Sequence, residues 1–372
     1  MKVLFVASVY RHFKAFHIPY MKLFQKKGYV VYACANSSDQ KEKKYLEQQG
    51  IVCIDISFER NPLSLKNVKA YKELKKLKEN IHFDLIHTHT PVASFLTRKV
   101  YANTQDTSVI YTAHGFHFYK GASKLSWLLY FNLEKIAMKW TDHIITINKE
   151  DFANAKLLGY TDEQISYVHG VGVDSSYNRL NLTQRNSLKK ELSIDENEIV
   201  VSYVAELNKN KNQMFLLQNW GEIKKAIPNA KLLFIGTGNS TDLYMNYVKK
   251  RGLQGIVFTG YRQDVMDILQ ITDIITLLSV REGLGKCLLE GMVVKLPCIV
   301  TDSRGPRDLV QDNFNGYIIQ NNDQDDLVEK FIKLLKDESL REEMGNKSYE
   351  LVQSYFLENV INEYDNIYGK YL

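Results

Sequence analysis

The sequence predicts an α/β protein built from two tandem doubly wound domains. Short apolar runs that are typical of β-strands alternate with helical segments along the chain, which indicates parallel sheets covered by helices on both faces. The alternation is interrupted once, in residues 171–195, by turn-forming residues and a charged stretch. The chain has 372 residues, which is too long for one ordinary hydrophobic core and suits two domains.

Strand-like runs are expected on both sides of the interruption. In the first half they cover residues 3–9, 29–35, 52–56, 84–90, 108–114, 143–147 and 165–169. In the second half they cover residues 199–205, 231–236, 256–260, 274–279, 298–301 and 317–319. Helical patterns fill the intervals, for example in residues 66–79 and 124–139. In such sheets ligands bind beyond the carboxyl ends of the strands, so we expect functional residues there.

The composition indicates a soluble, cytoplasmic protein. Hydrophobic residues make up 45% of the chain and charged residues 24%, which is ordinary for a globular domain. No apolar run reaches the roughly 18–20 residues of a membrane-spanning helix. The apolar N-terminus is predicted to be a strand, because Tyr10, Arg11 and His12 interrupt it and no cleavage site follows. The cysteines form no CxxC pair or metal spacing, and we expect reduced core residues: Cys34, Cys53, Cys287 and Cys298.

Positive charge is concentrated in the first half of the chain. Residues 1–180 contain 25 Lys/Arg and 16 Asp/Glu, whereas the remainder contains 23 and 27. This suggests an anionic surface or substrate, such as phospholipid headgroups or a lipid-diphosphate acceptor. No nucleic-acid-binding motif accompanies it, so nucleic acid is not an expected partner. The aromatic segment 127–131 is either a core-facing helix or an interfacial segment on the inner leaflet, and basic residues flank it: Lys120, Lys124, Lys135 and Lys139.

Two carboxylates, Glu282 and Glu290, follow an expected strand. The second is the only charge in the apolar run 287–294. We expect a helix to begin at about Leu284, so that the free N–H groups of Gly283 and Leu284 can bind a diphosphate. Eight residues of helix span roughly 12 Å, comparable with the distance from the hexose to the ribose of a nucleotide-sugar. Glu282 could then contact the sugar, and Glu290 the ribose hydroxyls. The alternative is a solvated helix glutamate.

This pair, after a strand that ends at Ser279, resembles the motif of glycosyltransferase family 4, whose members are retaining enzymes of the GT-B fold. The resemblance covers most of the chain. It implies two Rossmann-like domains that face a central cleft: an acceptor-binding domain in residues 1–180 and a donor-binding domain in residues 181–357. Residues 358–372 would cross back to the first domain as a helix.

The resemblance also assigns roles to individual side chains. His114, followed by a glycine, matches a family histidine near the donor sugar, so His114 and Glu282 are the expected catalytic residues. The alternative for His114 is a buried histidine that hydrogen-bonds the backbone. Lys211 matches a lysine that binds the donor diphosphate. Glu206 replaces the arginine expected before it, which moves part of that role to Lys209. A Glu-Leu pair followed by Lys-Asn resembles the capsule and exopolysaccharide subgroup.

Further contacts are expected at the same strand ends. Arg262 matches a family position that borders the nucleotide base, although an ion pair with Asp264 would explain it equally well. Several first-domain side chains are candidate acceptor contacts, with ordinary surface or core positions as the alternative: Arg11, His12, His89 and His117.

Two short patterns do not indicate a cofactor. Gly236 and Gly238 form a GxG without the third glycine, which is weak evidence for NAD. Asp323 and Asp325 form a DxD before an expected helix, where capping is the simpler role. Enzymes of this fold stabilise the leaving diphosphate with a helix N-terminus and basic side chains, so the resemblance implies neither a metal nor another cofactor.

The sequence therefore predicts a retaining hexosyltransferase. The donor is a nucleotide-sugar, with a UDP-sugar expected, and the acceptor is a hydroxyl of a lipid-linked glycan in capsule, exopolysaccharide or O-antigen synthesis. We expect a cytoplasmic enzyme with peripheral attachment to the inner face of the plasma membrane. One alternative is a UDP-sugar 2-epimerase of the same fold. Another is a non-catalytic glycan- or nucleotide-binding protein, for which Glu206 is the warning sign.

Overall fold

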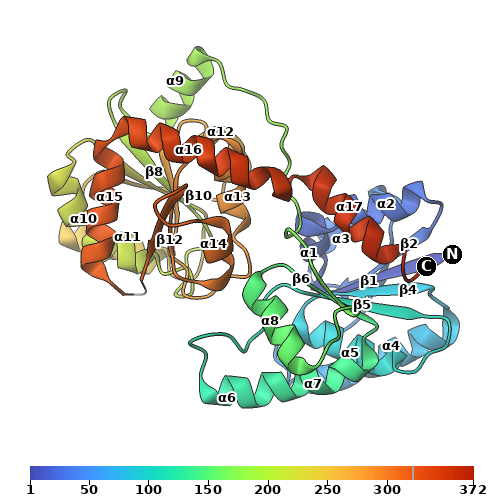
Figure 1. The fold of residues 1–372 in the computed structure, drawn as a ribbon. Helices are drawn as coiled ribbons and strands as arrows, with labels where there is room; N and C mark the ends of the chain where they lie inside the picture. Colours follow the sequence, from blue (N-terminus) through green and yellow to red (C-terminus); the bar gives the residue numbers. More distant parts are fainter. Residues whose placement is uncertain (321) are drawn as a thin grey trace. The chain divides into compact units, whose positions relative to one another are not determined.

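Two structural units divide the chain. The computed structural model describes residues 1–320 and 322–372. The first domain comprises Met1–Gly172 with Glu358–Leu372, and the second domain comprises Val173–Leu357 (Figure 1). The division falls earlier than the expected boundary between residues 180 and 181. The physical reason is that the N–H of Val173 donates to the carbonyl oxygen of Tyr355 at 2.9 Å, which ties residue 173 to the second unit.

The first domain contains a seven-stranded parallel sheet in the order β3-β2-β1-β4-β5-β6-β7. Each strand coincides with a predicted run to within a few residues, so the predicted strands are confirmed. The strands are β1 (Lys2–Val9), β2 (Val30–Asn36), β3 (Val52–Asp55), β4 (Leu85–Thr88), β5 (Ser108–Ala113), β6 (His143–Thr146) and β7 (Ile165–Tyr167).

Helices cover both faces of this sheet (Figure 1). Because side chains alternate along a strand, Phe5 packs with the helices of one face and Leu4 with those of the other. The face of Phe5 is covered by α1 (Tyr10–Phe16), α2 (Ile18–Lys26), α3 (Gln40–Gln48) and α17 (Leu357–Tyr368). The face of Leu4 is covered by α4 (Lys66–Asn80) and α5 (Pro91–Tyr101). A further cluster forms around α8 (Lys149–Leu158).

The C-terminal helix α17 returns to the first domain, as expected. Its apolar face joins the core of that domain through Val360, Tyr364, Ile367 and Tyr368. The Tyr368 hydroxyl also hydrogen-bonds Nδ1 of the buried His87, at 2.8 Å. The last helix of the chain is therefore part of the first domain's core.

The predicted helix over residues 124–139 forms, but it is not regular. It consists of α6 (Lys124–Ser126), a π-helical stretch (Trp127–Phe131), α7 (Asn132–Ala137) and a 3-10 turn (Met138–Trp140). Trp127, Tyr130 and Phe131 pack against the cluster around α8. None of the helices in residues 1–320 and 322–372 is long and apolar enough to cross a membrane.

The second domain contains a six-stranded parallel sheet in the order β10-β9-β8-β11-β12-β13. These strands also confirm the predicted runs: β8 (Ile199–Val204), β9 (Ala230–Ile235), β10 (Ile256–Gly260), β11 (Ile274–Leu277), β12 (Cys298–Thr301) and β13 (Gly316–Ile319). The helices are α9 (Leu182–Glu191), α10 (Gln213–Ala226), α11 (Thr241–Arg251), α12 (Val265–Leu269), α13 (Lys286–Val293), α14 (Arg304–Leu309), α15 (Gln324–Lys336) and α16 (Glu338–Val352). A 3-10 turn, Gln353–Tyr355, follows α16.

Local sequence explains several of these boundaries. Asp323 caps α15, because its carboxylate accepts the Asp326 N–H at 3.0 Å; the capping role expected for the DxD pattern is confirmed. Asn181 and Gln184 form a reciprocal capping box at the start of α9. All four cysteines are free, as expected, and Cys34 and Cys298 are fully buried.

Each sheet has one point at which the strand order reverses. In the first domain this switch lies between β1 and β4, and in the second between β8 and β11. In open α/β sheets the loops that leave neighbouring strands at such a point generally diverge to opposite faces, and ligands bind between them at the carboxyl edge. Glu282, Lys211 and the histidines described below lie at or next to these two points.

Candidate functional site

An ion pair joins the two loops at the switch point of the second domain. The ammonium of Lys211, after β8, contacts Oε2 of Glu282, after β11, and both side chains are about four-fifths buried. The Ser279 hydroxyl donates to the same oxygen at 3.3 Å. Burial opposes the charge on Lys211, but the nearby carboxylate outweighs it and raises the pKa of the lysine. Lys211 therefore stays cationic at this switch point.

Hydrogen bonds hold these two loops together, and sequence reasoning did not identify the residues responsible. The buried Tyr203 hydroxyl accepts the N–H of Leu278 at 2.7 Å and donates to the carbonyl of Lys211. The Asn210 side chain donates to the carbonyl of Arg281 at 2.9 Å. A tyrosine in a central, apolar strand was the available signal, since a buried phenol needs a partner.

The helix after Glu282 begins later than predicted. The expected start was about Leu284, whereas α13 begins at Lys286, and Gly285 precedes it with a left-handed backbone at φ 95°. Gly285 is required there because a side chain would be strained at that angle and would approach Leu277. The N–H groups of Gly283 and Leu284 therefore belong to a turn and not to the first turn of the helix.

Glu290 lies within α13, half-buried beside Lys286. The carboxylate oxygen and the lysine nitrogen are 3.7 Å apart. Burial raises the pKa of Glu290, and Lys286 only partly offsets this effect. Because α13 starts at Lys286, the assumption of eight helical residues between Glu282 and Glu290 is wrong, and the length of roughly 12 Å based on it does not apply.

The turn at Gly283 rests directly on α14. The sequence predicted residues 301–307 only as a loop after the Glu290 helix, and this contact was not predicted. A Cβ placed on Gly305 would lie 2.4 Å from the Gly283 oxygen and 2.4 Å from the Leu284 Cα. The neighbouring Arg304 is buried and donates from Nε to the carbonyl of Glu282 at 3.1 Å. Glycine followed by a proline in a loop after a strand was the available signal.

The remaining donor-side candidates occupy different settings. Lys209 is exposed and takes part in no ion pair within the described residues. Arg262 forms a bidentate pair with Asp264, at 2.8 and 2.5 Å, and a further contact with Glu191 at 2.5 Å. The guanidinium is therefore held by carboxylates here, which matches the ion-pair alternative. The Glu206 side chain, at the position of the expected arginine, is exposed.

The GxG pattern is explained by a close backbone approach. A Cβ on Gly236 would lie 2.1 Å from the Ala205 oxygen, and one on Gly238 would lie 2.2 Å from the Leu207 oxygen. The loop after β9 therefore lies against the loop after β8, and both glycines permit this contact. This packing accounts for the pattern without a dinucleotide.

Four histidines meet at the carboxyl edge of the first domain's sheet. His12 lies on α1 and His17 at its end, after β1; His89 follows β4 and His114 follows β5. Three of the four were expected here, and His17 was not. The Nε2 atoms of His12 and His17 are 3.2 Å apart, as are Nδ1 of His89 and Nε2 of His114. Burial lowers the pKa of His114 to about 4, so the imidazole is neutral at pH 7.

The other two acceptor-side candidates lie outside this cluster. Arg11 is largely exposed and forms a long ion pair with Asp39, at 4.0 Å. His117 packs beside Tyr130 with ring centroids 4.7 Å apart, and its carbonyl accepts the Ser126 hydroxyl at 2.6 Å. These contacts tie His117 to the 124–140 segment.

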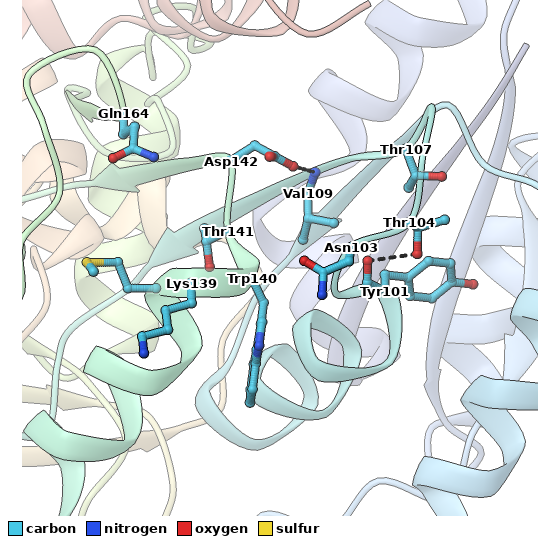
Figure 2. A pocket seen from close by; sticks show the side chains of 11 residues that line it. Tyr101, Asn103, Thr104, Thr107, Val109, Lys139, Trp140, Thr141, Asp142 and Gln164 are labelled. Carbon is cyan, nitrogen blue, oxygen red and sulfur yellow. Dashed lines mark hydrogen bonds between the residues drawn. The ribbon is translucent and has the colours of Figure 1, made fainter.

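A hollow of about 320 Å³ lies at the opposite edge of the first sheet. Figure 2 shows Val109 and Asp142, which flank the beginnings of β5 and β6, and the bond from the Val109 N–H to the Asp142 carboxylate is 2.7 Å long. Because ligands bind at the carboxyl ends of parallel strands, this hollow at their amino ends is not assigned to the active site.

Comparison with known proteins places the chain in a family. Residues 2–148 match the family described as "Glycosyl transferase 4-like", and residues 184–351 match "Glycosyl transferases group 1". The putative glycosyltransferase EpsD of Bacillus subtilis is 34% identical, over 100% of this chain and 97% of that protein. The chain is a family 4 glycosyltransferase.

Other relatives agree with this assignment. A UDP-Gal:alpha-D-GlcNAc-diphosphoundecaprenol alpha-1,3-galactosyltransferase of Escherichia coli is 28% identical, over 84% of this chain and 81% of that protein. The crystal structure of Anabaena Alr3699/HepE in complex with UDP and glucose aligns over 100% of both chains, with a TM-score of 0.81 and 16% identity. This likeness shows a common GT-B fold.

These comparisons confirm the predicted enzyme class and fold. They favour a transferase over both alternatives considered from the sequence, the 2-epimerase and the non-catalytic binding protein. The roles of the individual side chains in this glycosyltransferase stay predictions.

Proposed function

We propose that this glycosyltransferase is a retaining enzyme that transfers a sugar from a UDP-sugar to a hydroxyl of a lipid-linked glycan, in capsule, exopolysaccharide or O-antigen synthesis. The observation that carries the proposal is the Lys211–Glu282 pair, with the partly buried Glu290, at the switch point of the second domain. Two proteins similar to this chain support the choice of substrates. The name of one contains UDP-Gal and diphosphoundecaprenol, and the structure of the other is a complex with UDP and glucose.

The second domain is proposed to bind the donor. Lys211 stays cationic and stabilises the negative charge that develops on the leaving diphosphate, helped by the start of α13. Glu290, whose burial disfavours its charge, accepts hydrogen bonds from the ribose hydroxyls. The contact between Glu282 and Lys211 weakens, and the Glu282 carboxylate orients the donor sugar. The turn N–H groups of Gly283 and Leu284 and the side chain of Lys209 contribute further donors. No metal or other cofactor is required in this scheme.

The first domain is proposed to bind the acceptor and to supply His114. A neutral imidazole both donates and accepts hydrogen bonds, so His114 can bind a sugar hydroxyl without carrying a charge. The excess of basic residues in the first 180 positions attracts the diphosphate of a lipid-linked acceptor.

The 124–140 segment is proposed to dock this cytoplasmic enzyme on the inner leaflet. Its aromatic side chains pack inward, whereas Leu125, Leu128 and Leu129 are 72%, 66% and 48% exposed. Exposed lysines accompany these leucines: Lys120, Lys124, Lys135 and Lys139. Exposed apolar side chains among lysines suit the headgroup region of an anionic bilayer.

Ligand-dependent thermal stability tests the donor assignment. UDP, GDP, ADP and NAD are added separately, in EDTA, to the wild type, to Glu290→Gln and to Glu222→Gln, a matched change at an exposed position of α10. We expect UDP to raise Tm in the wild type and in Glu222→Gln, and to have little effect on Glu290→Gln. Stabilisation by NAD alone, or by none of the four, would contradict the proposal.

A further inference from the structure

The histidine cluster of the first domain has the composition and spacing of a metal site. One ring nitrogen from each of His12, His17, His89 and His114 lies within 4.8 Å of one from every other member. The four residues come from the ends of β1, β4 and β5, which are adjacent in the sheet, so the fold itself brings them together. None of the roles proposed above explains why four imidazoles should converge.

The other buried histidines of this domain show what a structural histidine looks like here. His87 bonds the hydroxyls of Thr112 and Tyr368, at 2.7 and 2.8 Å. His143 bonds the hydroxyls of Tyr371 and Ser166, at 3.0 and 2.9 Å. Both ring nitrogens are therefore satisfied in each case, as expected for buried polar groups.

The cluster lacks such partners. Within the described residues the ring nitrogens of its members bond only to one another, and two that are fully buried, His17 Nδ1 and His89 Nε2, have no hydrogen-bond partner. A buried polar atom without a partner destabilises the folded state. Four imidazoles without hydroxyl or carbonyl partners are therefore unusual unless they bind a ligand.

The protonation state of the four imidazoles favours a metal cation over an anion as the ligand of this cluster. Burial lowers the pKa of every member, and the neighbouring histidines lower it further for His12, His17 and His89. Arg60, the other charged group that acts on His12, also lowers its pKa. The imidazoles are thus neutral at pH 7, which is the form that ligates metals and not the form that binds phosphate.

The distances suit a tetrahedral ion. Zinc–nitrogen bonds of about 2.0–2.1 Å place the ligand atoms of a tetrahedral site roughly 3.3 Å apart. Two nitrogen pairs in the cluster are already 3.2 Å apart. His17 and His89 are stacked, with centroids 3.8 Å apart and planes at 25°, so their rings must turn for both lone pairs to converge. The torsion about the ring bond of histidine is broad, so it does not itself oppose this rotation.

We propose that the four-histidine cluster of His12, His17, His89 and His114 binds one divalent transition-metal ion of the zinc class. Imidazole nitrogen favours zinc, copper, nickel and cobalt, whereas magnesium and calcium prefer oxygen ligands. His12 and His114 are partly exposed, so the ion enters from their side. His114 binds the ion through one ring nitrogen, so its other ring nitrogen can still donate a hydrogen bond to a sugar hydroxyl as proposed above.

The test measures zinc binding by the full chain, purified without a histidine tag and stripped with EDTA. Zn²⁺ is titrated in competition with a chromophoric chelator, and Co²⁺ is added separately as a spectroscopic probe. We expect one ion per chain and the intense visible absorption of tetrahedral Co²⁺. His12→Gln and His89→Gln should each weaken binding at least about 100-fold, since the loss of a ligand exceeds the 10–100-fold effect of outer-shell changes.

Two controls distinguish zinc binding at the cluster from adventitious binding and from the effects of misfolding. His82→Gln removes an exposed histidine outside the cluster and should leave zinc affinity unchanged. Each variant must also retain cooperative thermal unfolding, which shows that a loss of binding is local. The proposal is overturned if the folded wild type binds no zinc, if the Co²⁺ spectrum is octahedral, or if the cluster variants bind as tightly as the wild type.

Discussion

Lys211 pairs with Glu282, and in the proposed function it also binds the donor diphosphate. It neutralises Glu282 where both side chains are about four-fifths buried, and it is the cation nearest to that carboxylate in the described part of the chain. In the proposed function, the anionic donor competes with Glu282 for the same ammonium. Negative charge on the diphosphate increases as the sugar leaves, so the attraction of Lys211 for it is strongest in the transition state.

Removing this charge should harm catalysis more than folding. We expect Lys211→Met to lower kcat/KM roughly 100- to 1000-fold, the usual cost of one lost electrostatic contact to a transition state. Lys209→Met, at an exposed position two residues earlier, is the matched control and should cost less than about tenfold. Steady-state kinetics with a UDP-sugar would show this difference; equal losses in the two variants would contradict the special role of Lys211.

Which residues lie at the carboxyl edge of each sheet could largely be predicted, because strand ends are readable from apolar runs. Glu282, Lys211, His89 and His114 all follow predicted strands, and the structure places them at or next to the switch point of their own sheet. Tyr203, Arg304 and His17 were not identified as site residues. Their importance depends on which loop lies opposite them, and tertiary packing alone decides this. For the same reason, the sequence could not decide whether Arg262 contacts the nucleotide base or forms an ion pair with Asp264.

At the scale of elements, the turn before α13 depends on α14. A Cβ on Gly305 would lie 2.4 Å from the Gly283 oxygen and from the Leu284 Cα, so no methyl group fits between α14 and this backbone. The beginning of α13 could not be predicted, because the helical pattern of apolar residues extends through Leu284, whereas the left-handed Gly285 delays the helix to Lys286.

A side chain at position 305 should displace the turn of Gly283 and Leu284, which is proposed to bind the donor. We expect Gly305→Ala to destabilise the protein by about 1–3 kcal/mol, the usual cost of overpacking, and to weaken UDP binding. Gly221→Ala, inside α10 with its nearest neighbour at 3.6 Å, should be neutral or stabilising by up to about 1 kcal/mol. Calorimetry with and without UDP measures both effects. Wild-type stability and UDP affinity in Gly305→Ala would show that the contact is unimportant.

For the 124–140 segment, the packing of the aromatic side chains is observed, whereas docking on a membrane stays a prediction. Its aromatic residues pack against the core, and Leu125, Leu128 and Leu129 are exposed with the lysines. We expect the protein to sediment with vesicles that contain about 30% anionic lipid, and a double Leu125→Asp, Leu128→Asp variant to sediment at least about tenfold less. Leu182→Asp, also at an exposed leucine, is the control. Equal sedimentation of all three proteins would contradict membrane docking by this segment.

For the whole molecule, the buried histidines make stability depend on pH. Burial lowers the pKa of His114 and His143 to about 4, below the value of about 6.5 in an unfolded chain. Between these values the unfolded chain binds more protons than the native one, so stability is complete above pH 6.5 and falls as the pH decreases.

Each such histidine should lower the free energy of unfolding by about 2 kcal/mol between pH 7.5 and pH 5. We therefore expect Tm, measured by calorimetry in EDTA, to decrease over this range, and His114→Gln to decrease less steeply than the wild type. Exposed His82→Gln should follow the wild type. A Tm that is constant down to pH 5, or identical slopes in all three proteins, would contradict the neutral state assigned to the cluster.

The return of α17 to the first domain also dictates an order of events during biosynthesis. When residues 1–172 have left the ribosome, the groove that Tyr364 and Tyr368 fill is still open and His87 still lacks the Tyr368 hydroxyl. At about 5–20 residues per second, the ribosome needs roughly ten seconds or more to deliver the missing helix. The half of the chain that is made first is thus completed last, and for that interval its exposed apolar groove is a natural client surface for chaperones.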